Sequence, residues 1–158
     1  MKEYNIILGC LSDDDIYCIS DENVIIVEPY IENYKRITRF KKYNYYIYDC
    51  TGKIELYYAT NIPSDLRWLS VDKADIINDI TDHCELSRAK KMLAIASITS
   101  CSYNTITLYD LFNKNGIKFD DQVNVYVSID VDISKSLKDD RLGNFNISVY
   151  YNDRGTLI

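Results

Sequence analysis

The residues from Gln122 to Ile133 constrain the fold most, because apolar and polar residues alternate there without a break. Side chains of a β-strand point to opposite faces at every second position, so this alternation predicts a strand with one buried face. A slip of one residue would expose the whole apolar set to water, and the pairing register is therefore well defined. The apolar set is Val123, Val125, Val127, Ile129, Val131 and Ile133.

The first sixty residues predict a series of shorter strands. Acidic turns separate the first three apolar runs, and Cys50-Thr51-Gly52 lies between the last two runs. A three-residue connection that ends in glycine is typical of a β-hairpin. We therefore expect an antiparallel meander over residues 1–60. Its expected strands are 4–11, 16–20, 24–27, 34–40, 43–49 and 53–59.

Residues 70–115 have the pattern of helices. Apolar residues recur at intervals of three and four from Ala74 to Ala96, which predicts two helices, or one bent helix, within 71–99. Ser70 is a suitable N-cap for the first. A short third helix is expected to begin after Thr107 and to end in a left-handed cap at Gly116.

Alternation returns in residues 144–151, where Phe145, Ile147, Val149 and Tyr151 define an inner face. We expect this strand to pair antiparallel with 122–133, so that residues 122–151 form a hairpin. Strands, then helices, then strands indicate an α+β fold. A chain of 158 residues suits one such domain over 1–158.

The charge balance narrows the range of partners. The chain carries 24 acids against 18 Lys and Arg, for a net charge of −6. This balance disfavours general attraction to nucleic acid or to an anionic membrane. No apolar run approaches the length of about 20 residues that a transmembrane helix needs. We therefore expect no membrane partner and no direct binding of nucleic acid.

The number and spacing of the cysteines indicate a reducing compartment. Their number, five, is odd, and no C-x-x-C pair occurs. We expect free, mostly buried thiols and a cytoplasmic location, in the producing cell or in a host cell. No glycine-rich phosphate-binding pattern occurs either, and we expect no bound cofactor.

Acidic residues recur at intervals of three and four along the first predicted helix, so they share one face. Such a face is usually a solvated one. It is also what a protein needs to enter a cationic channel by presenting carboxylates in place of phosphates. The four acids are Asp72, Asp75, Asp79 and Asp82.

The predicted hairpin is rich in tyrosine on both faces, so one face has to expose several rings. Exposed tyrosines offer a large contact area at a low entropic cost, and we interpret them as a candidate partner-binding surface. Trp68 is a further candidate, since tryptophan is enriched at binding hot spots. The six tyrosines are Tyr43, Tyr45, Tyr46, Tyr48, Tyr57 and Tyr58.

Catalytic patterns are sparse. The only histidine is His83, which removes most histidine-dependent chemistry. Asp130 and Asp132 share the polar face of the long strand, about 6–7 Å apart by strand rise. Two such carboxylates could hold Mg²⁺ for phosphoryl chemistry, although a solvated strand face explains them more simply.

These observations predict a non-enzymatic, acidic protein that binds and occludes a basic surface of a protein partner. A nucleic-acid-binding enzyme would offer such a surface. Phage or viral antagonists of host defence and toxin-immunity proteins have this profile by analogy. One alternative is a metal-dependent nuclease or phosphodiesterase that uses Asp130 and Asp132. The other is a binder of single-stranded nucleic acid through the basic, tyrosine-rich residues 34–58.

Overall fold

The computed structural model describes residues 1–9, 23–62, 69–128 and 133–152. The chain forms two compact units. The first combines Met1–Gly52 with Asn104–Ile158, and the second is Lys53–Tyr103. None of the helices in the described ranges has the length and apolar character needed to cross a lipid bilayer.

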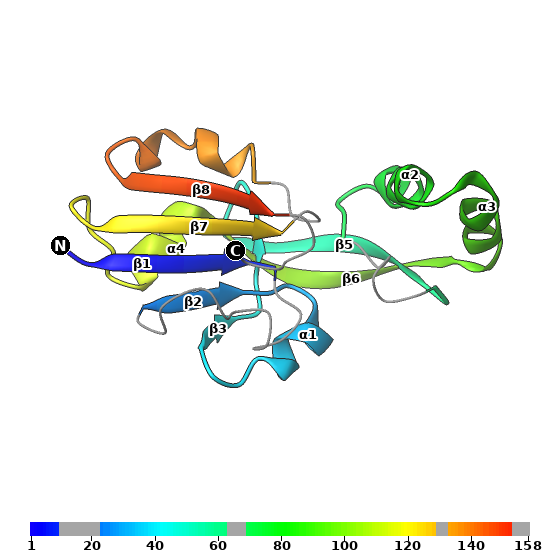
Figure 1. Cartoon of the computed structure of the whole chain (residues 1–158), viewed down its shortest axis with the longest axis horizontal. Coiled ribbons are helices and arrows are strands. Elements are labelled where there is room, and N and C mark those ends of the chain that lie inside the picture. Colours follow the sequence, from blue (N-terminus) through cyan, green and yellow to red (C-terminus); the bar gives the residue numbers. More distant parts are fainter. Residues whose placement is uncertain (10–22, 63–68, 129–132, 153–158) are drawn as a thin grey trace. The chain divides into compact units, whose positions relative to one another are not determined.

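The first unit contains a five-stranded sheet with the order β3-β2-β1-β7-β8 (Figure 1). Each pair of neighbouring strands is parallel, and the register aligns Ile6 with Ile25 on one side and with Val125 on the other. The central strand is therefore β1, while β3 and β8 form the edges. The strands are β1 (Glu3–Leu8), β2 (Val24–Val27), β3 (Lys41–Tyr43), β7 (Gln122–Ser128) and β8 (Asn146–Asn152).

This sheet shows that the predicted fold class was wrong. The described residues of 1–60 do not form the predicted antiparallel meander, since β1, β2 and β3 pair in parallel. The predicted strand 16–20 lies outside the described residues. The antiparallel hairpin over 122–151 is absent too, since β7 and β8 are parallel neighbours. Residues 129–145 connect them, and the structure describes 133–145 of this connection, with Leu142 buried in the core. About a dozen residues are enough for a crossover, which returns the chain to the amino end of the sheet as parallel pairing requires.

Residues 34–40, predicted as an exposed strand, overlap helix α1 (Ile31–Arg36) instead. The charges around this helix explain the difference. Glu32 lies in the first turn, and Lys35 and Arg36 lie in the last turn. Acids near the amino end and cations near the carboxyl end favour a helix through its dipole, whereas the β-forming residue types of this stretch suggested a strand.

The predicted tyrosine hairpin is also absent. Its residues are divided among β3, β4 (Tyr46–Ile47) and β5 (Gly52–Thr60). A second, mixed sheet has the order β4-β6-β5, in which β4 is parallel to β6 (Ser97–Ile106). Strand β6 was not predicted, and its first residues, 97–99, lie within the range 71–99 in which we expected helices.

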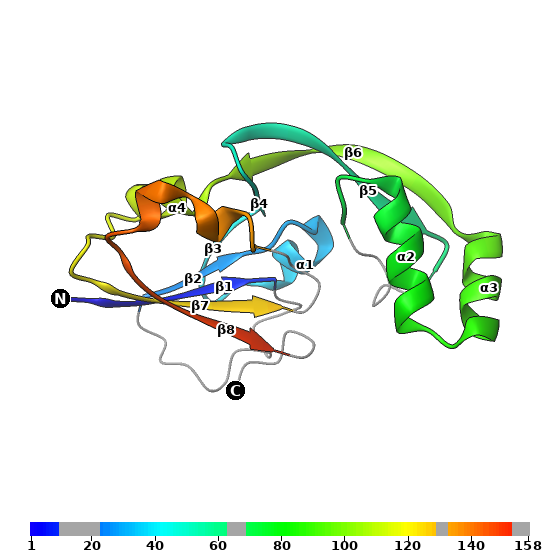
Figure 2. The same cartoon turned by 90° about the horizontal axis from the view of Figure 1, so that it is seen from above.

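One face of the five-stranded sheet carries the main core. Helix α4 (Leu108–Lys114) and the 3₁₀ helices η3 (Ser136–Lys138) and η4 (Asp140–Leu142) lie over this face (Figure 2). Leu111 and Phe112 of α4 are fully buried against the alternating valines of β7, and the ring of Phe112 meets that of Phe145 edge-on at 5.1 Å. Val123, Val125 and Val127 are each 0% exposed, so the predicted inner face of this strand is confirmed over the described residues.

The caps predicted for α4 are confirmed. The Thr107 side chain accepts a hydrogen bond from the Asp110 amide at 3.0 Å. At the other end Gly116 has φ of 67°, and the amide of Ile117 donates to the carbonyl of Phe112 at 3.0 Å. The left-handed conformation suits glycine because it has no Cβ, and it turns the chain so that Ile117 packs in the core beside Phe112.

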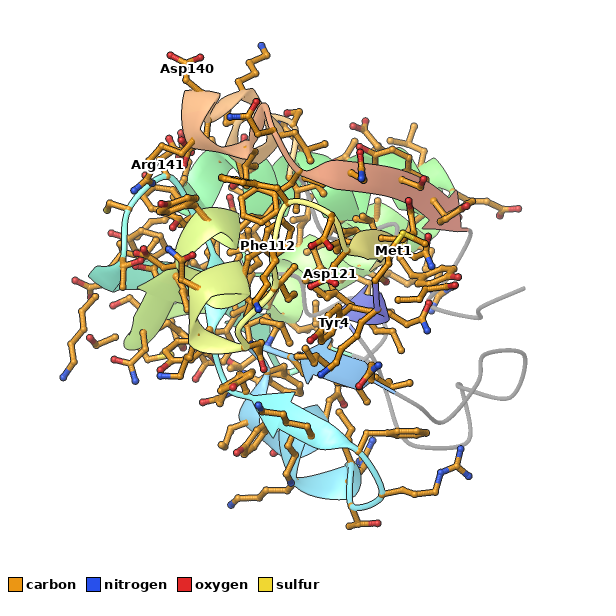
Figure 3. All side chains as sticks on the ribbon, turned by 90° about the vertical axis from the view of Figure 1, so that its left-hand side faces the viewer. Met1, Tyr4, Phe112, Asp121, Asp140 and Arg141 are labelled. Atoms are coloured by element: carbon orange, nitrogen blue, oxygen red, sulfur yellow. The ribbon has the colours of Figure 1, made fainter. Side chains whose placement is uncertain are left out.

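A buried carboxylate holds the amino end of β1 close to the start of β7. Asp121 accepts hydrogen bonds from the amides of Lys2 and Lys118, each at 2.9 Å. These bonds hold the pKa of Asp121 below its ordinary value of 3.8. Figure 3 shows Asp121 beside Met1 and Tyr4, at the end of the sheet where β1 begins.

The second face of the five-stranded sheet is half apolar and half polar. Ile7, Val24 and Ile26 form a small apolar cluster with Ile37, which follows α1. Polar side chains occupy the same face of β7 and β8. Since the long strand was expected to have one solvated face, the burial of Asn124, which is 8% exposed, is a correction to that prediction.

The second unit contains α2 (Lys73–His83) and α3 (Leu86–Ile95), which confirms two helices within 71–99. They follow β5 and precede β6 in the chain, as Figure 1 shows. Ile76 and Ile80 of α2 and Ala89 of α3 pack with Ala59 and Ile62 in a small core. Burial of one stripe on each helix leaves most of their surface exposed.

Candidate functional site

The predicted acidic face lies on α2, and part of it stabilises the helix itself. The Asp72 side chain accepts a hydrogen bond from the Ala74 amide at 2.9 Å, so Asp72 is the N-cap. The expected cap, Ser70, lies two residues earlier in the chain. The Ser70 hydroxyl instead donates to Asp75 at 3.2 Å and accepts from the Asp72 amide. Two of the four acids thus hold the amino end of α2, and their carboxylates remain exposed.

How much charge the other acids of this region present depends on their exposure and on their ion pairs to described residues. Asp82 and Glu85 are exposed, and the side chain of Asp79 lies outside the described residues. Within the described part of the chain, Asp72, Asp75 and Asp82 form no ion pair. Their negative charge is therefore available to a partner.

The same unit exposes several large apolar side chains, which sequence reasoning did not single out. Their exposure ranges from 36% for Leu93 to 66% for Leu86. Exposed apolar residues beside charged ones are common at protein interfaces, although single exposed residues need no explanation. The set is Val71, Ile77, Leu86, Leu93 and Ile95.

The six tyrosines of the predicted hairpin do not share one face. All six are half-buried, and none of them is fully exposed. Tyr57 lies in the second unit with the Lys73 ammonium 5.2 Å above its ring, whereas Tyr43 and Tyr45 lie in the first unit. Tyr46 and Tyr48 form a separate tilted pair at 6.2 Å. Trp68 lies outside the described residues.

Tyr43 and Tyr45 belong to a compact arrangement that we call the lysine–tyrosine cluster, made of Lys41, Tyr43, Tyr45 and Lys114. The two rings are 5.8 Å apart with an angle of 32° between their planes. The Lys114 ammonium lies 5.7 Å from one ring and 5.8 Å from the other, and that of Lys41 lies 5.7 Å from Tyr43. Because Lys114 comes from α4, no local pattern of sequence could have indicated this cluster.

Asp130 and Asp132, the candidate metal ligands, lie outside the described residues. What the structure does describe is the end of β7 at Ser128, next to the end of β1 at Leu8. In the strand order, the chain passes from β1 to its neighbour β2 in one direction and from β7 to its neighbour β8 in the opposite direction. The boundary between β1 and β7 is therefore a topological switch point. In open parallel sheets, ligands bind beyond the carboxyl ends of such strands.

The remaining titratable candidates are few. The side chain of His83 is not among those described, nor are Cys10 and Cys18. Cys50 is an exposed free thiol, while Cys84 and Cys101 are half-buried free thiols. None of these three is fully buried, contrary to our expectation of mostly buried thiols.

One polar network covers the second face of the sheet where β1 and β7 meet. The Asn124 amide donates to Glu3 at 2.9 Å and to Asn5 at 3.1 Å, and its oxygen accepts from Gln122 at 3.2 Å. Next to it the rings of Tyr126 and Tyr150 stack at 5.1 Å, and burial raises the pKa of Tyr126. These hydrogen bonds fix the positions of the polar side chains on this face of the sheet.

Comparison with protein-family models, with curated proteins and with solved structures finds no match to this chain. The candidate sites therefore have to be weighed on the charge, exposure and geometry of their own residues.

Proposed function

We propose that the chain is a non-enzymatic binding protein that occludes a basic surface of a protein partner with the acidic face of α2. The observation that carries this proposal is the charge of Asp72, Asp75 and Asp82, which are exposed and form no ion pair with any residue in the described ranges. Uncompensated charge accelerates association with an oppositely charged surface and helps to select the partner. The exposed Ile77 and Leu86 would supply apolar contact area beside it.

A nucleic-acid-binding enzyme is the partner that we propose, since its basic channel accepts phosphates and would also accept a row of carboxylates. Phage or viral antagonists of host defence and toxin-immunity proteins act in this general way, and the analogy is one of type. We place the protein in the cytoplasm of the producing or host cell. The free thiols of Cys50, Cys84 and Cys101 support a reducing compartment.

The test is a charge reversal with a matched control. Tagged wild-type protein, the variant Asp75→Lys with Asp82→Lys, and the variant Arg88→Glu with Lys91→Glu serve as parallel baits in host lysate. Because Asp72 is kept, its bond from the Ala74 amide remains, while the Ser70–Asp75 hydrogen bond is lost. A partner retained by the wild type and by the α3 control, but lost with the α2 variant, is the expected result.

The captured partner then allows a kinetic measurement. At low salt, the α2 variant should associate about tenfold more slowly than the wild type, and the rate should depend less on salt. Circular dichroism of each bait checks that the helices form. Equal capture and equal rates for the wild type and the α2 variant would contradict the proposal.

A second candidate function is that of a metal-dependent nuclease or phosphodiesterase. The parallel sheet supports it, because β7 ends at the switch point and Asp130 and Asp132 come two and four residues after Ser128 in the sequence. With Mn²⁺ or Mg²⁺ and a phosphodiester substrate, the variant Asp130→Asn with Asp132→Asn should lose at least about a hundredfold of the hydrolysis rate. The exposed Asp140→Asn is the matched control. Hydrolysis that survives in the double variant would end this assignment.

A further inference from the structure

The lysine–tyrosine cluster lies on an edge of the five-stranded sheet, where β3 has a neighbour on one side only. Lys41 and Tyr43 are two residues apart in β3, so their side chains share one face of the strand. Lys114 reaches the same rings from the last turn of α4. Two cations thus flank one pair of rings, although one of them lies about seventy residues away in the sequence.

The charge around the cluster is locally positive in an acidic protein. Residues 33–48 contain no acid and five of the 18 basic residues of the chain. Within the described residues, neither Lys41 nor Lys114 forms an ion pair. Their ammonium groups lie over the rings of Tyr43 and Tyr45. Their charge is available to an anion at this edge of the sheet.

Two further cation–ring pairs lie near the same edge but on the other face, because Lys42 alternates with Lys41 and Tyr43 in β3 and Phe40 packs against the second-face cluster. The Lys42 ammonium lies 4.2 Å from the ring of Tyr34, and the Arg39 guanidinium lies 4.4 Å from the ring of Phe40. Cations and aromatic rings therefore occur together on both faces of this edge. This combination is the one that proteins use to track a single-stranded nucleic acid, with cations on the phosphates and rings under the bases.

The rings of the cluster are held in place. Tyr43 and Tyr45 pack against the main core, and the Tyr43 hydroxyl donates to Asn115 at 3.3 Å. The lysine–ring distances of 5.7–5.8 Å are close to the limit of about 6 Å for a cation–π interaction. A weak contact of this kind can exchange, so that the ammonium moves to a phosphate while a base packs on the ring.

We propose that the lysine–tyrosine cluster binds single-stranded nucleic acid, with Lys41 and Lys114 on phosphates and Tyr43 and Tyr45 in contact with bases. Duplex bases are stacked on one another and do not offer their faces to the rings. An acidic polypeptide would satisfy the lysines and leave the rings without a partner. The net charge of −6 restricts this binding to the positive edge of the sheet and to low salt.

The experiment measures fluorescence anisotropy of two labelled strands with the full chain at low salt. One strand is an oligothymidine of about twelve nucleotides, and the other is an abasic strand with the same number of phosphates. We expect the wild type to bind the oligothymidine about tenfold more tightly than the abasic strand. Equal affinity for the two strands, or no binding to either, overturns the proposal.

Variants assign the binding to the cluster. Tyr45→Leu keeps an apolar side chain against the core and should abolish the tenfold preference, whereas Tyr45→Phe keeps the ring and should retain it. Lys41→Gln with Lys114→Gln should lower the slope of log affinity against log salt by about two. Lys90→Gln with Lys91→Gln, on α3, is the matched control and should change neither quantity.

Two outcomes would contradict the assignment even if binding occurs. One is that the α3 control loses as much affinity as the variant Lys41→Gln with Lys114→Gln, which would indicate diffuse attraction of the strand to surface cations. The other is competition by polyglutamate as effective as competition by the oligothymidine, which would indicate an acidic protein as the ligand. The Asp75→Lys, Asp82→Lys variant should keep its preference for bases, so that this test and the test of the acidic face fail independently.

Discussion

The amide network between β1 and β7 allows a quantitative test of how the sheet face is stabilised. Asn5 and Asn124 are 6% and 8% exposed, and the Asn124 amide donates to Asn5 at 3.1 Å. Asn124→Val removes this bond and leaves the Asn5 oxygen buried without its donor. A buried polar group without a partner destabilises by about 1–3 kcal/mol, so we expect a loss of about 2 kcal/mol.

The other two partners of Asn124 contribute less to this loss. Glu3 is exposed, so water can replace the bond that its carboxylate accepts. Gln122 is half-buried and keeps its bond to Ser148 at 3.1 Å. Most of the expected loss therefore comes from the Asn5–Asn124 pair.

A double-mutant cycle isolates that pair. With Asn5→Val and Asn124→Val together, both amides are gone and two valines lie side by side on neighbouring strands, next to Val24. Replacing both partners of a buried hydrogen bond by apolar groups is nearly neutral, so the double variant should be more stable than Asn124→Val alone. We expect a coupling of at least about 1 kcal/mol.

Urea unfolding followed by circular dichroism measures the four free energies of the cycle. Asn146→Val is the matched control, because it makes the same change at an exposed position on the same face of β8 and should shift stability by less than about 0.5 kcal/mol. Losses that add within about 0.5 kcal/mol would refute the reasoning, since independent sites are additive to that extent.

Three further predictions concern the core and the ends of its elements. Phe112→Ala should destabilise the protein by about 3–5 kcal/mol, because Phe112 is 0% exposed, and denaturant unfolding would measure the loss. Gly116→Ala should cost about 1–2 kcal/mol through its positive φ alone, since a Cβ there meets no atom within 4 Å; an unchanged melting temperature would contradict this. The amide bonds to Asp121 lower its pKa below 3.8, so its stabilisation is complete above that value and is lost as pH falls through the lowered pKa. In urea titrations at several pH values, Asp121→Asn should therefore be less stable than wild type at neutral pH, with the difference shrinking in acid.

Elements with local signals could be predicted from the sequence. The cap at Thr107, the glycine at Gly116 and the buried valines of β7 were all correctly identified, because each depends on residues within a few positions of one another. The two helices within 71–99 were found for the same reason. Periodicity and capping are local properties, and they survive in the folded protein.

Strand direction could not be predicted in the same way. The apolar runs of β1 and β2, IIL and VIIV, are typical of strands buried on both faces, as in a parallel sheet. We had interpreted them as parts of a meander because the acidic turns between them are short enough for hairpins. The pairing partner of a strand is a non-local choice, and alternation in one strand does not determine it.

The sequence by itself determined that residues 71–99 contain helices, which side of β7 is apolar, and where α4 begins and ends. Only the tertiary structure decided that the strands run parallel, that Asn124 is buried against Asn5, and that Lys114 meets Tyr43 and Tyr45. The physical reason is the range of the interactions. Hydrogen bonds and caps within one turn act between near neighbours, whereas sheet pairing and side-chain clusters bring together residues that are far apart in the chain.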